Sequence, residues 1–231
     1  MGRNHIKTMA APKSWPVERK SKKFILLPEP GRHSRNSSIS LNFLLITMLG
    51  VAESKKETTY IAKEKEITVN GSRVTRISYP IGLMDVISIK DIKKNYRILI
   101  DRKGKVIAKE IKASDSSILL HRVKGKSSVN GKTQLNFLDG TNIIVEKDSY
   151  KIGDTVITEV GKNDIKDHLK LEKGNTIFLI GGRHSGELGK IENIHENKII
   201  YKTKENEMYE TLKEYAFVVG KDSPLIEIQN E

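Results

Sequence analysis

Residues 66 to 89 constrain the fold of this chain more than any other stretch, because a tight turn signal separates short apolar segments there. Asn70-Gly71 is a pair that accepts positive φ at both central positions of a two-residue hairpin turn. Ile67 and Val69 alternate with polar residues before this pair, and Val74 continues the apolar pattern after it. We therefore predict a β-hairpin. Arg73 and Arg76 lie at or near its turn, where they are expected to be free to reach a phosphate.

The chain carries a large excess of positive charge. Its 231 residues include 41 Lys and Arg against 29 Asp and Glu, which gives a formal net charge of +12. This excess favours a polyanionic partner, nucleic acid first and an acidic membrane surface second. A basic protein without such a partner is the alternative. Residues 1 to 35 contain nine basic residues against Glu18 and Glu29, and thus more than half of the net charge.

The first 37 residues are predicted to form a basic extended tail. They show no helix or strand period and are interrupted by prolines, so we expect that they do not fold alone. The single tryptophan, Trp15, leaves two interpretations open. It could stack on a base or fill a groove of a partner, or it could fold back onto its own domain.

Two helices are predicted between this tail and the hairpin. In the first, apolar residues recur at helical spacing at Leu41, Leu44, Leu45, Met48 and Leu49, with Ser37 or Ser38 as N-cap and Gly50 near the stop. The second helix covers about residues 54 to 65.

The second helix has a clear start signal. Ser54 and Glu57 have the spacing of a capping box, and Tyr60 and Ile61 are expected to face inward. The helix ends and the basic residues Lys55, Lys56, Lys63 and Lys65 are expected to flank a groove suited to phosphates. Two helices followed by a hairpin would form a compact unit.

The longest apolar run covers residues 41 to 51. It has about half the length needed to cross a bilayer, and the polar leader before it is too long for a signal peptide. We therefore expect a soluble protein.

Short predicted strands alternate with turn signals after Ile87, which is the pattern of an all-β barrel or sandwich. The predicted strands cover residues 96–101, 106–111, 117–123, 133–137, 141–145 and 155–160. From Lys173 a third unit is expected, with strands at 175–180 and 198–203, a glycine-rich loop between them and a closing strand at 214–220.

The glycine-rich loop does not match a nucleotide-binding motif. Gly189-Lys190 is followed by Ile191 rather than Ser or Thr, and no helix is predicted after the loop. The glycines indicate a close backbone approach. Arg183, His184 and Lys190 accompany them, so RNA contact and a plain barrel turn both remain possible interpretations.

The residues needed for the common catalytic and metal sites are missing or badly spaced. The sequence has no cysteine, its six histidines show no paired metal-ligand spacing, and no G-x-S-x-G motif occurs. We predict no enzymatic activity, no cofactor and no metal. The absence of cysteine fits a reducing cytoplasm.

The chain resembles the archaeal and eukaryotic small-subunit ribosomal protein S-four-e family along nearly its whole length. The residues that carry the resemblance are Ala10 to Trp15, Ile77 to Ile89, Asp101 to Lys105, Tyr150 to Thr155, Ile165 to Asn175, Gly181 to Ile191 and Phe217 to Pro224. The first helix lacks the arginine that this family usually carries, which shifts the expected contacts to Lys55, Lys56 and the tail. The short C-terminus after Pro224 is typical of an archaeal-like member.

The resemblance implies an α+β, mostly β protein with several modules. These are a basic extended tail (1–37), an S-four-type RNA-binding domain (38–90), a central β domain (91–172), a KOW barrel, which is a small SH3-like barrel (173–210), and a closing strand with a C-terminal tail (211–231). The candidate RNA-binding residues are Arg3, Lys7, Lys13, Trp15, Arg19, Lys20, Lys22, Lys23, Arg32, Arg35, Lys55, Lys56, Arg73, Arg76, Arg183, His184 and Lys190.

The function expected from this resemblance is that of a structural constituent of the small ribosomal subunit in the cytoplasm. Its partners would be ribosomal RNA and neighbouring ribosomal proteins, without a membrane or a small-molecule substrate. The alternative is a free RNA-binding regulator or a transcription-elongation-type KOW factor, because KOW barrels also occur in such proteins.

Overall fold

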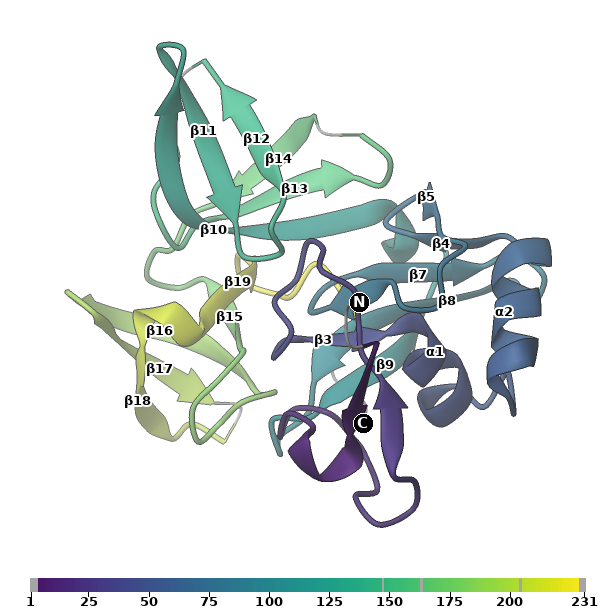
Figure 1. Ribbon diagram of the computed structural model, residues 1–231. Helices are drawn as coiled ribbons and strands as arrows, with labels where there is room; N and C mark the ends of the chain where they lie inside the picture. The colour runs from purple at the N-terminus through teal and green to yellow at the C-terminus, as the bar shows by residue number, and fades with distance from the viewer. Residues whose placement is uncertain (1–3, 147, 163, 204, 229–231) are drawn as a thin grey trace. The chain divides into compact units, whose positions relative to one another are not determined.

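The computed structural model describes residues 4–146, 148–162, 164–203 and 205–228. In these ranges the chain is mostly β, with five sheets, and α2 (Lys55–Glu64) is the longest helix (Figure 1). The prediction of a mostly β protein is therefore confirmed. The chain divides into two compact units, unit 1 (Met1–Leu99 with Lys105–Ser117) and unit 2 (Ile100–Gly104 with Ile118–Glu231).

Unit 1 contains a five-stranded sheet with the order β5-β4-β7-β8-β9. Ile89 at the end of β7 pairs with Lys94 at the start of β8, so the sheet continues across the domain limit expected between residues 90 and 91. The strands are β4 (Ile67–Val69), β5 (Ser72–Arg73), β7 (Val86–Ile89), β8 (Lys94–Ile100) and β9 (Val106–Ile111).

The hairpin predicted at Asn70-Gly71 is confirmed. Asn70 has φ 50° and Gly71 has φ 82°, and Val69 pairs with Ser72 across the turn. The Asn70 side chain is buried and donates from Nδ2 to Oδ1 of Asp85 at 2.7 Å, while its Oδ1 accepts from the Val86 amide at 2.8 Å. The turn residue therefore also binds β4 to the start of β7.

The first predicted helix is shorter than expected, and its predicted N-cap is wrong. Ser38 belongs to β3 (Ser38–Ser40), which pairs with β6 (Pro80–Gly82). Ser40 is the cap, because its hydroxyl accepts from the Phe43 amide at 3.3 Å. α1 (Leu41–Phe43) then continues into the π-helical η2 (Leu44–Met48), close to the predicted stop.

The second predicted helix is confirmed as α2. Ser54 accepts from the Glu57 amide at 3.2 Å, and the Glu57 carboxylate accepts from the Glu53 amide at 2.8 Å. Ile61 is buried as expected, but Tyr60 is 62% exposed. The buried positions Thr58, Ile61 and Ala62 share one helix face, and Tyr60 is turned about 100° away from Ile61.

The N-terminal segment is folded, contrary to the extended tail that we predicted. β1 (His5–Lys7) pairs with β2 (Phe24–Leu26), and η1 (Thr8–Ala10) follows β1. Trp15 is only 2% exposed and lies 6.1 Å from the Phe43 ring, within the hydrophobic core of unit 1. The segment folds because it has this core to pack against, which the composition of the segment alone does not indicate.

Unit 2 contains two five-stranded sheets. The first has the order β12-β11-β10-β13-β14 and is built on the long strand β10, which pairs with β11 on one side and β13 on the other. Its strands are β10 (Ile118–Val129), β11 (Lys132–Phe137), β12 (Asn142–Val145), β13 (Thr155–Glu159) and β14 (Ile165–Leu169). The predictions of β10 to β13 are confirmed, whereas β14 was missed.

The second sheet has the order β18-β17-β16-β15-β19. Its strands are β15 (Thr176–Leu179), β16 (Leu188–His195), β17 (Lys198–Thr203), β18 (Met208–Leu212) and β19 (Ala216–Gly220). The closing strand, predicted at 214–220, is confirmed as β19, which pairs with β15. β18 was missed, and the short η4 (Lys213–Tyr215) joins it to β19. The remaining short helix, η3 (Asp115–Ser117), ends unit 1.

Candidate nucleic-acid interface

The two units differ sharply in charge. The residues of unit 1 include 22 Lys and Arg against 10 Asp and Glu, whereas those of unit 2 include 19 of each. The net charge of +12 is therefore located entirely on unit 1. A surface that attracts a polyanion is expected on unit 1 before unit 2.

Most of the candidate cations in the N-terminal segment are exposed. Those at the surface are Lys7, Lys13, Lys20, Lys22, Lys23 and Arg35, while Arg32 is half-buried and Arg3 lies outside the described residues. They belong to a segment that packs against the core of unit 1, so the fold restrains their backbone positions.

Two candidates from this segment have structural roles. Arg19 donates from Nη1 to the Met9 carbonyl at 2.9 Å and from Nη2 to the Ala11 carbonyl at 3.3 Å, which ties the segment together. Trp15 is buried, so its assignment as an RNA-binding residue is wrong for this conformation, and the interpretation that it folds back onto its own domain is confirmed.

The two arginines after the hairpin turn are exposed but engaged. Arg73 donates from Nη2 to the Lys63 carbonyl at 2.8 Å. Arg76 lies 3.5 Å from the Glu29 carboxylate, which also accepts from the Ser78 hydroxyl at 2.5 Å. Both arginines stay within reach of an external phosphate, although each would have to give up or share a present contact.

At the start of α2 a side-chain cap already occupies one backbone amide, and two lysine side chains are exposed. Ser54 occupies the Glu57 amide, and the Glu57 carboxylate adds negative charge at the same end of the helix. Lys55 and Lys56 are exposed and have no side-chain hydrogen bond or ion pair within the described residues. We therefore expect phosphate contact here from the lysine side chains and not from the helix terminus.

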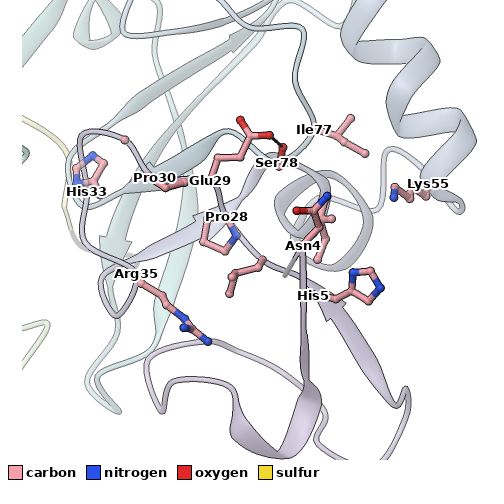
Figure 2. Close-up of a pocket in the computed structure, with 13 residues that line it drawn as sticks. Asn4, His5, Pro28, Glu29, Pro30, His33, Arg35, Lys55, Ile77 and Ser78 are labelled. Atoms are coloured by element: carbon pink, nitrogen blue, oxygen red, sulfur yellow. Dashed lines mark hydrogen bonds between the residues drawn. The ribbon is translucent and has the colours of Figure 1, made fainter. Parts of the chain in front are cut away.

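A groove of about 710 Å³ lies between the N-terminal segment and the start of α2 in unit 1. In Figure 2, Pro28 and Asn4 lie between Arg35 on one side and His5 with Lys55 on the other. A neighbouring groove of about 350 Å³ shares His5, Leu26 and Lys55 with the larger one. Sequence reasoning missed both, because their lining residues are far apart in the chain.

The glycine-rich loop of unit 2 approaches its own backbone. A Cβ atom on Gly186, which has φ +81°, would lie 2.6 Å from the carbonyl carbon of Asp101. The close approach that the glycines indicate is therefore satisfied within unit 2.

The polar candidates of this loop are mostly paired. His184 lies 3.3 Å from Glu187, and its ring centroid is 4.1 Å from that of Tyr209. Lys190 donates to Asp222 at 2.9 Å, and this hydrogen bond lowers the pKa of the Asp222 carboxyl. Arg183 is exposed and has no side-chain partner among the described residues, so it is the best-placed cation of the loop.

Two arginines act inside the fold. Arg97 is buried in unit 1 and donates to the Asp115 carbonyl at 2.7 Å, and burial lowers its pKa to about 10. Arg122 connects the two sheets of unit 2 by donating to the Ala216 carbonyl at 2.8 Å and the Lys213 carbonyl at 3.0 Å. Burial also lowers the pKa of Arg122.

The described ranges contain no group of three or more His, Cys, Asp or Glu side chains that could hold a metal ion. Three histidines instead pair singly with aspartates. His33, His121 and His168 each lie 2.8 Å from the carboxylate of Asp85, Asp139 and Asp154 respectively. Within the same ranges, the helices are too short or too polar to cross a membrane.

Comparisons with known proteins identify relatives over almost the whole chain. The sequence model of the Ribosomal family S4e matches residues 92–165, and that of the RS4NT (NUC023) domain matches residues 1–36. The protein named small ribosomal subunit protein eS4 from Methanosphaera stadtmanae is 37% identical, with 98% of this chain and 96% of that protein covered. The protein of the same name from Methanocaldococcus jannaschii is 34% identical, with 98% of each chain covered.

A solved structure agrees with these relatives. The crystal structure of the 30S ribosomal protein S4e from Thermoplasma acidophilum matches with a TM-score of 0.70 and 25% identity. The match covers 80% of this chain and 96% of that one. On the full-length sequence similarity and the shared fold together, this chain belongs to the ribosomal protein family S4e.

Proposed function

We propose that this chain is a structural, non-catalytic constituent of the small ribosomal subunit, which binds ribosomal RNA and supports subunit assembly and translation. The observation that carries the proposal is the location of the whole net charge of +12 on unit 1. The relatives named small ribosomal subunit protein eS4 support it. Its partners are then small-subunit ribosomal RNA and neighbouring ribosomal proteins in the cytoplasm.

The contacts proposed for RNA are cations that are exposed and whose side chains make neither a hydrogen bond nor an ion pair within the described residues. They are Lys7, Lys13, Lys20, Lys22, Lys23, Arg35, Lys55 and Lys56 on unit 1 and Arg183 on unit 2. Arg73, Arg76, His184 and Lys190 are proposed as weaker contacts, because an RNA phosphate has to compete there with a present partner.

We also propose that two modules within the units have the folds that the family resemblance implies. The succession of α1, α2 and the Asn70-Gly71 hairpin supports an S-four-type RNA-binding domain within residues 38–90. The five-stranded sheet from β15 to β19 supports a KOW-type module that begins near residue 173. β19 pairs with β15, so this module includes the closing strand beyond residue 210.

Sedimentation of a native lysate through a sucrose gradient tests the ribosomal role directly. We expect the chain to migrate with small subunits and whole ribosomes at about one copy per subunit, and to remain there at moderate salt. Recovery mainly at the top of the gradient, at either salt concentration, would contradict the proposal and favour a free RNA-binding regulator.

A further inference from the structure

The groove in unit 1 has a composition that suits one kind of ligand. Together with its neighbour it is called here the N-terminal groove. Its apolar surface comes from half-buried Leu26, Leu27 and Ile77 and buried Pro28. The larger part, at about 710 Å³, falls within the roughly 300–1,000 Å³ typical of sites for small organic groups.

The charged rim of the N-terminal groove is mainly basic. Arg35 and Lys55 line the larger part and Lys22 lines the smaller part, and none of these side chains has a hydrogen bond or ion pair within the described residues. The acidic residues of the rim are Glu29 and Glu53. The Glu29 carboxylate is already engaged by Ser78 and Arg76. The Glu53 carboxylate makes no ion pair with Lys22 or Lys55 in the described residues, so these cations are available to an anionic ligand.

Aromatic rings lie at the same rim. Phe24 lines the smaller part and is 50% exposed, with its ring centroid 5.9 Å from that of His5 in an edge-to-face arrangement. Sites for single-stranded nucleic acid combine exposed aromatic rings, on which the bases stack, with nearby cations that neutralise the phosphates.

We infer that the N-terminal groove receives unpaired nucleotides of RNA, with a base against the apolar surface and the Phe24 ring and phosphates at Arg35, Lys55 and Lys22. An RNA duplex cannot place its bases there, because its paired bases are stacked inside the helix. This inference rests on the proposed function and adds to it the selection of single-stranded over duplex RNA.

The test measures the binding of the full-length chain to a fluorescein-labelled oligouridylate and to a blunt RNA duplex over a series of salt concentrations. The double variant Arg35→Ala/Lys55→Ala removes the two cations of the larger part. For the oligouridylate we expect the plot of log K against log salt to become less steep by about 1.4, because each phosphate contact with a single strand contributes about 0.7 to the slope. Lys93→Ala/Lys105→Ala is the matched control, because it removes two exposed lysines of unit 1 that lie outside the groove.

A variant that keeps the charge separates stacking from electrostatics. Phe24→Ala truncates a half-exposed side chain, so the fold should be retained, which circular dichroism checks. We expect it to weaken oligouridylate binding at least about 5-fold, the lower end of the effect of removing a stacked aromatic, and to leave duplex binding unchanged.

Three outcomes overturn the inference. The groove variants could bind the oligouridylate as the control does, they could lose both RNAs equally, or Phe24→Ala could have no effect. In each of these cases the wild-type chain still binds RNA and the proposed function stands. A wild-type chain that binds neither RNA also overturns the inference, whereas the proposed function is decided separately by the sucrose gradient.

Discussion

Unit 1 and unit 2 have similar numbers of basic residues, but only unit 1 is positively charged. The counts of Lys and Arg are 22 and 19, whereas those of Asp and Glu are 10 and 19. The units therefore differ mainly in their acidic residues. A count of lysines and arginines alone would not locate the proposed surface for RNA, which we expect where the balancing carboxylates are missing.

Ion pairs occur in both units, and in unit 1 they include those of Lys65, Lys90 and Lys94, but they are missing from the N-terminal lysines in the described part of the chain. In unit 2, Lys126, Lys132, Lys162, Lys166, Lys190 and Lys198 each lie within 4 Å of a carboxylate. In unit 1, the N-terminal lysines from Lys7 to Lys23 have no such partner in the described part of the chain. A phosphate that contacts these lysines releases water and counterions and breaks no existing ion pair, although Lys23 also lies 5.6 Å from the centroid of the Phe24 ring.

The largest effect is expected when four positive charges are removed from unit 1 instead of from unit 2. We predict that replacing Lys7, Lys13, Lys20 and Lys22 together by Gln makes the plot of log K for ribosomal RNA against log salt less steep. The slope should change by about 0.9 for each phosphate that these lysines neutralise in the wild-type chain. The matched control changes Lys124, Lys151, Lys173 and Lys221 of unit 2, which are exposed and have no side-chain ion pair in the described ranges.

Filter binding at a series of salt concentrations measures both slopes. The comparison between the units predicts a clearly smaller slope for the unit 1 variant and a nearly unchanged slope for the control. Equal decreases of the slope in the two variants would show that only the total net charge matters for RNA binding. The difference in charge between the units would then not locate the binding surface.

The second prediction concerns the fold of the N-terminal segment. Trp15→Ala should lower the free energy of unfolding by about 3–5 kcal/mol, since it empties the space of a large side chain that is 2% exposed. Urea denaturation followed by circular dichroism measures this loss. Trp15→Phe keeps an aromatic ring in contact with Phe43 and serves as the milder variant. A loss below about 1 kcal/mol for Trp15→Ala would mean that the segment is not an integral part of unit 1.

The features that could be predicted from the sequence are local ones. The Asn70-Gly71 turn depends on the backbone preferences of two adjacent residues, and the start of α2 depends on Ser54 and Glu57, three residues apart. The candidate cations could likewise be identified by residue type. Each of these predictions requires no knowledge of what lies across the fold.

The features that could not be predicted depend on distant contacts. Trp15 is buried because the strand pairing of β1 with β2 and the helical segment after Ser40 form one core. β14 and β18 escaped notice because their exposed charged and polar residues interrupt the apolar pattern of a strand, and only pairing with β13 and β17 defines them. The N-terminal groove is likewise lined by residues from several segments.

A smaller effect is expected from the glycine-rich loop of unit 2. Gly186→Ala should destabilise unit 2, because its Cβ would lie 2.6 Å from the Asp101 backbone and its φ is +81°. Gly161→Ala is a close control, since Gly161 has the same φ and nothing lies within 4 Å of its added Cβ. Both variants incur the cost of about 1–2 kcal/mol for a left-handed residue, so any further loss in Gly186→Ala measures the clash.

Thermal unfolding of the two variants gives the comparison. A lower melting temperature for Gly186→Ala than for Gly161→Ala would support an internal role for the loop glycines. Equal melting temperatures would indicate that residues 181–187 are free to move away from residues 101–102. The loop backbone would then again be a candidate for contact with RNA.

The smallest effect is a change in one pKa, and it tests whether the cations of unit 2 are paired internally. The hydrogen bond from Lys190 lowers the pKa of Asp222 below its ordinary value of 3.8, because it favours the charged carboxylate. Lys190→Ala removes the donor, so the pKa of Asp222 should rise toward that value. Carbon-detected NMR titration of the Asp222 carboxyl follows the change, with Lys173→Ala as a control for the loss of one positive charge.

Since the pair is exposed, salt should produce part of the same rise in the wild-type chain. An Asp222 pKa that is the same with and without Lys190 would mean that this lysine is as free as the N-terminal lysines of unit 1, and the contrast in pairing between that segment and unit 2 would fail at Lys190.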